Sequence, residues 1–124
     1  MHRLQWLCRR MPVAAAVLTA AVFVAAPPAH ADTVAYLFNV MVRPGYNFAS
    51  ADDALGYGNG ICDKVAGDRT YAGLIADVKA DFDTTDEYQA SYLISQAVNE
   101  LCPAQIWKLR NSAAHYRPGP DATE

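Results

Sequence analysis

Carboxylates are the most numerous side chains in this sequence that could do chemistry, and five of them gather near its middle: Asp77, Asp81, Asp83, Asp86 and Glu87. Such a density suggests a calcium site. A calcium loop of the EF-hand type that began at Asp81 would need glycine at its sixth position and glutamate at its twelfth, but Asp86 and Tyr92 stand there. We therefore expect a solvated loop with Asp86 and Glu87 in the first turn of a helix, and no metal.

Groups for covalent or acid-base catalysis are few. Nucleophilic hydrolysis needs a base beside a serine or cysteine, and the only histidine after residue 31 is His115, near the C-terminus. Pairs such as Asp52 with Asp53, or Asp81 with Asp83, could in principle hydrolyse glycosides. Neighbouring carboxylates at a helix start are usually caps, however. We expect no catalytic residue, no cofactor, and a protein that is not an enzyme.

The run Gly56-Tyr57-Gly58-Asn59-Gly60 is rich in glycine. A dinucleotide or phosphate loop would need a preceding strand and a helix that starts at the glycines, and the sequence predicts neither. We expect instead that Gly56 and Gly60, one helical turn apart, let another helix approach closely beside Cys62. The cost in helix propensity is about 1 kcal/mol for each glycine.

The first 31 residues have the three parts of a secretory signal peptide. Three arginines make a basic start, Pro12 to Ala26 runs 15 residues without a charge, and Ala29 and Ala31 place small residues where a signal peptidase reads them. A membrane-spanning helix needs about 20 apolar residues, which this run does not reach. We expect cleavage between Ala31 and Asp32, export, and no stable membrane anchor afterwards.

Removing this segment makes the chain more acidic. The 124 residues carry a formal net charge of −3, whereas the 93 residues from 32 to 124 hold seven basic and 13 acidic side chains, a net charge of −6. That length fits one domain and not two. Because nucleic-acid binding needs a basic face, we expect no nucleic acid among its partners. The expected location is extracellular or associated with the cell envelope.

Cleavage also changes the cysteine count, because Cys8 leaves with the signal peptide and two cysteines remain. In an oxidising compartment a disulfide between Cys62 and Cys102 is the default expectation for a small domain. It would close a loop of about 40 residues and stabilise the fold by about 4 kcal/mol on the chain-entropy model.

Apolar spacing predicts four to five short helices over residues 32–115, an all-α bundle. The first carries Val34, Leu37, Phe38 and Met41 on one face and ends before Pro44. The second begins at Ser50, and its inward face holds Ala54, Leu55, Gly58, Ile61, Cys62 and Val65.

Thr70 caps a third helix, whose apolar stripe is Tyr71, Leu74, Ile75, Val78 and Phe82. Thr84 and Glu87 form a capping box before a fourth, which buries Ala90, Leu93, Ile94, Ala97, Val98 and Leu101. Pro103 starts a fifth helix with Ile106, Trp107 and Arg110. Residues 116–124 have no period and are predicted to be a disordered tail.

Two segments resemble a known family. Gly58-Asn59-Gly60-Ile61-Cys62-Asp63 and Ala97-Val98-Asn99-Glu100-Leu101-Cys102-Pro103 are similar to segments of small secreted actinobacterial, mostly mycobacterial, proteins grouped as domain of unknown function 732 (DUF732). Members look like a signal peptide, a leading amphipathic helix, a Gly-x-x-x-Cys helix and a closing helix that ends in Cys-Pro. The resemblance implies this fold and export, and it implies no activity because the family has no assigned one.

Aromatic side chains remain as candidates for recognition, since all seven tyrosines follow residue 31 and some must stay exposed on so small a body. We predict a contact patch of Arg43, Tyr46 and Phe48 on the Pro-Gly loop. Tyr57, Tyr88 and Tyr92 come next. The alternative is that Phe48 covers the second helix while Tyr88 and Tyr92 line the core.

Three functional hypotheses follow. The first is a non-enzymatic exported binding or interaction protein, whose partner is an unknown protein or envelope component. The second is a carrier of a small ligand or lipid, held in an apolar cavity between the helices. The third is a small hydrolase.

Overall fold

In a computed structural model of the chain, residues 31–119 are described and form five α-helices. They are α1 (Thr33–Met41), α2 (Ala51–Ala66), α3 (Tyr71–Asp81), α4 (Glu87–Leu101) and α5 (Ile106–Ala113), with a short 3-10 helix η1 (Pro103–Gln105) before α5. No strand occurs in this part of the chain, so the predicted all-α class is confirmed.

The predicted signal peptide lies outside the described residues, except for Ala31. Between residues 31 and 119 there is no helix with the length and apolar character needed to span a bilayer.

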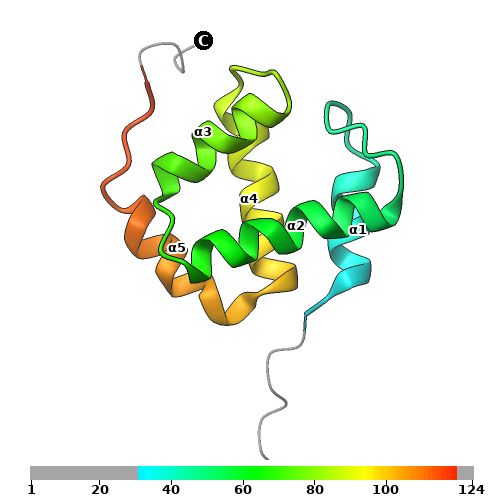
Figure 1. Cartoon of the computed structure of the whole chain (residues 1–124), viewed down its shortest axis with the longest axis horizontal. Helices are drawn as coiled ribbons and strands as arrows, with labels where there is room; N and C mark the ends of the chain where they lie inside the picture. The colour runs from blue at the N-terminus through cyan, green and yellow to red at the C-terminus, as the bar shows by residue number, and fades with distance from the viewer. Residues whose placement is uncertain (1–30, 120–124) are drawn as a thin grey trace, which may run out of the picture.

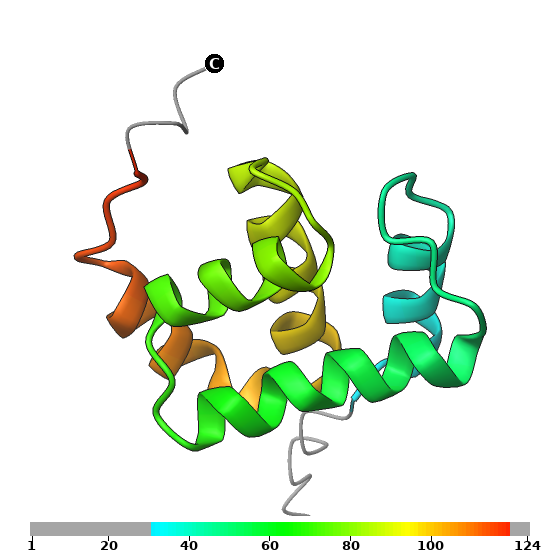
Figure 2. The same ribbon diagram turned by 45° about the horizontal axis from the view of Figure 1, so that its top comes forward.

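Helix α4 lies at the centre of the bundle and contacts α1, α2 and α3 (Figure 1). Helix α2 runs across the whole molecule beneath it. Helix α1 packs at one end of α2, and α3 and α5 lie toward the other end (Figure 2). As a result α1 forms one edge of the molecule, with a side that no other helix covers in either view.

Side chains cap the helices largely where the sequence predicts. The Ser50 hydroxyl accepts a hydrogen bond from the Asp53 amide at 3.1 Å, and the Thr70 hydroxyl accepts one from the Gly73 amide at 3.0 Å. The Asp32 carboxylate accepts one from the Ala35 amide at 2.8 Å and so begins α1. Each of these bonds satisfies an amide that has no partner within its helix.

The predicted capping box at the start of α4 is wrong. Asp86, and not Thr84, is the N-cap, because its carboxylate accepts from the amides of Tyr88 at 2.9 Å and Gln89 at 3.3 Å. The Thr84 hydroxyl instead accepts from the Asp86 amide at 3.1 Å. An acidic cap also interacts favourably with the positive end of the helix dipole, which explains why the carboxylate takes this place.

The predicted inward faces of α2, α3 and α4 are confirmed. Twelve of their apolar positions are buried: Ala54, Gly58, Ile61, Val65, Leu74, Ile75, Val78, Ala90, Leu93, Ile94, Ala97 and Val98. A disulfide joins Cys62 of α2 to Cys102 after α4, as expected. The core therefore lies around α4, where α2 and α3 pack against it and residues of α1 and α5 complete it.

Helix α1 packs on the core through a different side from the one that the sequence predicts. Tyr36 and Val40 are buried, whereas Val34, Phe38 and Met41 face outward; of the four predicted residues, Leu37 alone packs against the core, partly buried. The Tyr36 ring fits where Gly58 of α2 has no side chain. The prediction for Gly56 and Gly60 is likewise wrong, because a Cβ at either would meet nothing within 4 Å, and Gly58 between them is the position of close approach.

The C-terminal helix differs in detail. Leu109 is its buried residue, and Trp107 is 61% exposed. Tyr116, the first residue of the predicted tail, still packs on the domain: its ring centroid lies 4.9 Å from that of Tyr71, and its hydroxyl donates to the Glu87 carboxylate at 2.8 Å.

Candidate interaction surface

The predicted contact patch of Arg43, Tyr46 and Phe48 does not form a common surface. Tyr46 is only 4% exposed, and its hydroxyl donates a 2.6 Å hydrogen bond to the carbonyl of Gln89. Phe48 is half-buried, with its ring centroid 5.7 Å from that of Phe82. The turn at Gly45, whose φ is +107°, folds these rings toward the protein, so Tyr46 and Phe48 stabilise the loop and do not offer a free contact.

Arg43 lies instead against two tyrosines of α4. The guanidinium carbon is 3.8 Å from the ring centroid of Tyr92 and 5.1 Å from that of Tyr88, distances at which a cation is attracted to an aromatic face. Burial lowers the pKa of Arg43, but its contacts with Tyr88 and Tyr92 raise it by more. We call Arg43, Tyr88 and Tyr92 the arginine–tyrosine cluster.

Arg43, Arg110 and Arg117 form no ion pair within residues 31–119, and Arg43 is distinguished from the other two by its contact with two aromatic rings. Lys64, Arg69, Lys79 and Lys108 each form an ion pair with a carboxylate. Arg43 forms none with any residue between 31 and 119. Stacking occupies the face of its guanidinium, and a planar guanidinium donates its hydrogen bonds from its edge. The cluster can therefore accept an anionic group from outside the domain.

A depression of about 460 Å³ lies beside the cluster and is open to solvent. Its walls combine apolar and polar side chains: Asn39, Val42 and Pro44 from the end of α1 and the following loop, with Asp86 and Gln89 from the start of α4. Val42 connects this depression to the outer side of α1.

The outer side of α1 exposes four large apolar side chains. Val34 is 78% exposed, Phe38 69%, Val42 68% and Met41 42%. They are spaced by three or four residues and therefore share one side of the helix, opposite the buried Tyr36 and Val40. We call these four residues the α1 face. The spacing in the sequence predicts that Val34, Phe38 and Met41 share one apolar face. The structure exposes these three residues and does not bury them.

The alternative prediction for the aromatic residues is confirmed in part. Tyr92 packs partly buried against the core, and the centroid of the Phe48 ring lies 5.9 Å from that of Tyr57 on α2, whereas Tyr88 is 61% exposed. The only sequence signal that Tyr88 and Tyr92 join Arg43 is their spacing of four residues, which places both rings on one side of α4.

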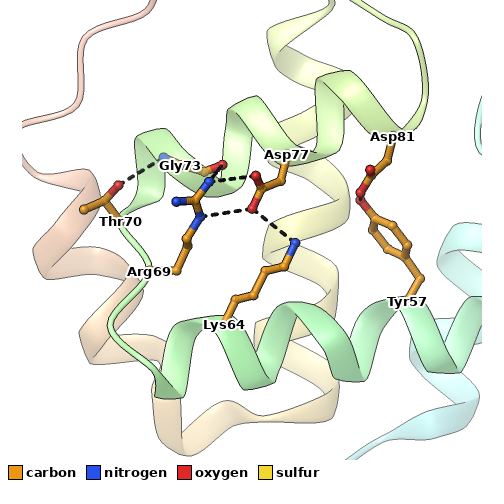
Figure 3. Close-up of polar contacts among 7 residues, drawn as sticks. All are labelled: Tyr57, Lys64, Arg69, Thr70, Gly73, Asp77 and Asp81. Atoms are coloured by element: carbon orange, nitrogen blue, oxygen red, sulfur yellow. Dashed lines mark hydrogen bonds and ion pairs between the residues drawn. The ribbon is translucent and has the colours of Figure 1, made fainter.

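Asp77 and Asp81, two of the five acidic residues near the middle of the chain, are held in local polar contacts (Figure 3). The Asp77 carboxylate accepts from Arg69 at 2.7 Å and from Lys64 at 3.1 Å, and together they hold its pKa below the ordinary value. The Asp81 carboxylate accepts from the Tyr57 hydroxyl at 2.7 Å. These contacts join α2 to α3. Within residues 31–119 no three histidine, cysteine or acidic side chains are grouped in a way that could hold a metal ion.

The groups considered for catalysis lie apart. His115 is exposed beyond the end of α5, and Cys62 and Cys102 are bonded to each other. Asp52 and Asp53 are exposed in the first turn of α2, where acidic residues stabilise the helix start.

Comparison with known proteins gives one match. The model of a family described as Protein of unknown function (DUF732) matches residues 30–104, more than half of the chain. The matched range contains both bridged cysteines, the α1 face and the arginine–tyrosine cluster, and it ends before Trp107. No curated protein and no solved structure matches the chain.

Proposed function

We propose that this chain, which belongs to the DUF732 family, is an exported, non-enzymatic interaction protein that binds a partner at the cell envelope or outside the cell. The observation that carries the proposal is the α1 face. Single exposed apolar side chains are common on soluble proteins, but contiguous apolar patches mark interaction sites. Here four such side chains share one side of a nine-residue helix and its following residue.

The arginine–tyrosine cluster supports the same surface. Tyrosine and arginine, together with tryptophan, are enriched among the residues that contribute most of the binding energy at protein interfaces. Tyr88 and Arg43 lie beside Val42 in the lining of one depression, so the cluster and the α1 face are continuous. A partner on this surface would bury apolar side chains and meet a cation at one end.

The acidic side chains and cysteines that could take part in catalysis already form contacts within the fold, which supports a non-enzymatic role. Asp77 and Asp81 hold α2 against α3, the cysteines bridge α2 to the end of α4, and Glu87 binds Lys79 and Tyr116. The depression beside the arginine–tyrosine cluster is open to solvent, which favours a surface contact over the carriage of an enclosed lipid.

Photo-crosslinking tests the proposal. A photo-reactive phenylalanine analogue replaces Phe38 in cells that produce the full chain, and the matched control replaces Trp107, which is 61% exposed against 69% for Phe38. We expect the chain in the envelope or medium, with adducts at position 38 about tenfold more abundant than at position 107. Equal adducts at both positions would contradict the binding surface, and a chain confined to the cytoplasm would contradict export.

A further inference from the structure

We infer that the carboxyl end of α4 is a binding site for the chain's own N-terminus, the α-ammonium group that removal of the signal peptide creates on Asp32. The inference rests on the proposed function, because it needs export, and it adds how cleavage fixes the helix that carries the α1 face. Three observations carry it: the hydrogen bond of the Asp32 amide, the disulfide that fixes its acceptor, and the charges around that nitrogen.

The Asp32 amide is the nitrogen of the peptide bond at which we expect cleavage. It donates a hydrogen bond at 2.5 Å to the carbonyl of Glu100, in the last turn of α4. Hydrolysis of the Ala31–Asp32 bond consumes one water, leaves a carboxylate on Ala31 and converts this amide into an α-ammonium group. The same nitrogen then donates to the same carbonyl with a positive charge, and a hydrogen bond from a charged donor is stronger than one from a neutral donor.

The Glu100 carbonyl is an acceptor that α4 does not satisfy by itself. The last four carbonyls of a helix have no partner within it, and Pro103, three residues after Glu100, has no amide hydrogen to donate. The disulfide from Cys62 to Cys102 ties this end of α4 to α2, two residues beyond Glu100. The rest of the fold therefore holds the acceptor in place for the N-terminus.

The charges around the Asp32 nitrogen favour a cation. Helix α1 runs antiparallel to α4, since its start meets the Glu100 carbonyl while Asn39, near its end, donates to Gln96 at 2.8 Å. The nitrogen therefore lies at the negative end of the α4 dipole. It also lies at the start of α1, whose positive dipole end opposes a cation, but the Asp32 carboxylate compensates that end by capping the Ala35 amide at 2.8 Å. The direct contact with α4 decides the sign, so a charged N-terminus stabilises the fold.

Cleavage thus strengthens the attachment of α1 to α4. Before cleavage the attachment at this end is a neutral hydrogen bond, and afterwards it is a charged one. Asp32 is exposed, so solvent screens the charge and the effect on the folding equilibrium is about two- to fivefold. The contact fixes the first turn of α1, to which Val34 of the α1 face belongs.

Acetylation of the α-amino group tests the inference on the processed protein as recovered from the producing cell. It keeps an N–H that can donate to Glu100 but removes the positive charge. At the start of an isolated helix this change is stabilising, because a cation there opposes the dipole. We expect the opposite here. In urea at low salt and about pH 6, where the free α-amino group is charged, acetylation should raise the equilibrium constant of unfolding about two- to fivefold, and by less in high salt.

The matched control is a chain with three additional residues, alanine, glycine and serine, before Asp32. Its ammonium group lies up to about 10 Å beyond the Glu100 carbonyl, outside the range over which the end of a helix acts on a charge. Acetylation of this extended chain should leave the unfolding constant unchanged. Mass spectrometry confirms the first residue of each chain and the position of the acetyl group.

The outcomes separate this inference from the function on which it rests. The inference is overturned if acetylation leaves the native chain equally or more stable, if the extended chain loses as much, or if the exported chain begins at a residue other than Asp32. In each case the proposed function still stands when position 38 gives more crosslinked adducts than position 107. Equal adducts at the two positions, or a chain confined to the cytoplasm, overturn the proposed function itself.

Discussion

The ring of Tyr36 occupies the space that Gly58 leaves by having no side chain. A Cβ at Gly58 would lie 2.6 Å from the Cζ and the hydroxyl oxygen of Tyr36, and that hydroxyl donates a 2.8 Å hydrogen bond to the carbonyl of Ala54. Because Tyr36 belongs to α1 and Gly58 to α2, this contact determines which side of α1 faces the core. It therefore also determines which side is exposed for binding.

The close approach at Gly58 predicts opposite effects for two glycines of the same helix. Gly58→Ala should destabilise the fold by about 1–3 kcal/mol, because the methyl group has to displace the Tyr36 ring. Gly60→Ala meets nothing within 4 Å and should stabilise the fold by up to about 1 kcal/mol through its better helix propensity. Urea denaturation measures both. Destabilisation of similar size in the two variants would contradict the close packing of Tyr36 on Gly58.

Loss of the disulfide should destabilise the domain strongly. Cys62 and Cys102 are separated by 40 positions in the chain, and replacing both by alanine should lower the free energy of unfolding by about 3–4 kcal/mol. Urea denaturation of this double variant against the native chain measures the difference. A thiol titration of the native protein should find no reactive thiol, and two reactive groups per chain would show that the bridge is absent.

Buried tyrosines make the fold sensitive to alkaline pH. Burial raises the pKa of Tyr46 from 10.0 to about 12. Since the neutral phenol is favoured in the folded state, its contribution is complete below pH 10 and is lost as the pH rises from about 10 to about 12, by up to about 2 kcal/mol. Tyr46→Phe should show a shallower decline over this range. Tyr88→Phe is the matched control at an exposed ring, and an equal change there would contradict the role of burial.

The Asp77 contacts predict a modest dependence on acid and salt. Arg69 and Lys64 lower the pKa of Asp77, so their contribution is present at neutral pH and is lost as the pH falls below the ordinary carboxyl range. Asp77→Asn should cost about 1 kcal/mol at pH 7 in low salt and less in high salt, because Lys64 and Arg69 are nearly half exposed. Asp63→Asn, at an exposed carboxylate of α2, should have no such effect in the same denaturation experiment.

Local patterns were sufficient for much of the fold. In α3 the spacing of Leu74, Ile75 and Val78 defines one stripe of large apolar residues. The exposed opposite side carries only the small residues Ala72, Ala76 and Ala80, so the stripe is the side that gains most from facing the core. The hydroxyls of Ser50 and Thr70 mark helix starts because they can satisfy free amides from within a few residues. The cap of α4 was missed because Thr84 and Asp86 are both good caps, and their spacing does not distinguish them.

The contact patch could not be predicted in the same way. Arg43, Tyr46 and Phe48 are close in sequence, but the turn at Gly45 directs Tyr46 and Phe48 toward Phe82 while Arg43 stacks on Tyr92. Which rings meet depends on contacts between segments about 40 residues apart. Sequence spacing contains no information about such distances.

By itself, the sequence determined that the chain is helical, where most of its helices begin, and that Cys62 and Cys102 are available to pair, because these properties depend on neighbouring residues and residue counts. Only the tertiary structure decided which side of α1 is buried. Both sides carry apolar residues, Tyr36 and Val40 on one and Val34 and Phe38 on the other. The choice depends on a fit between helices, since the Tyr36 ring needs the space at Gly58 and its hydroxyl needs the Ala54 carbonyl.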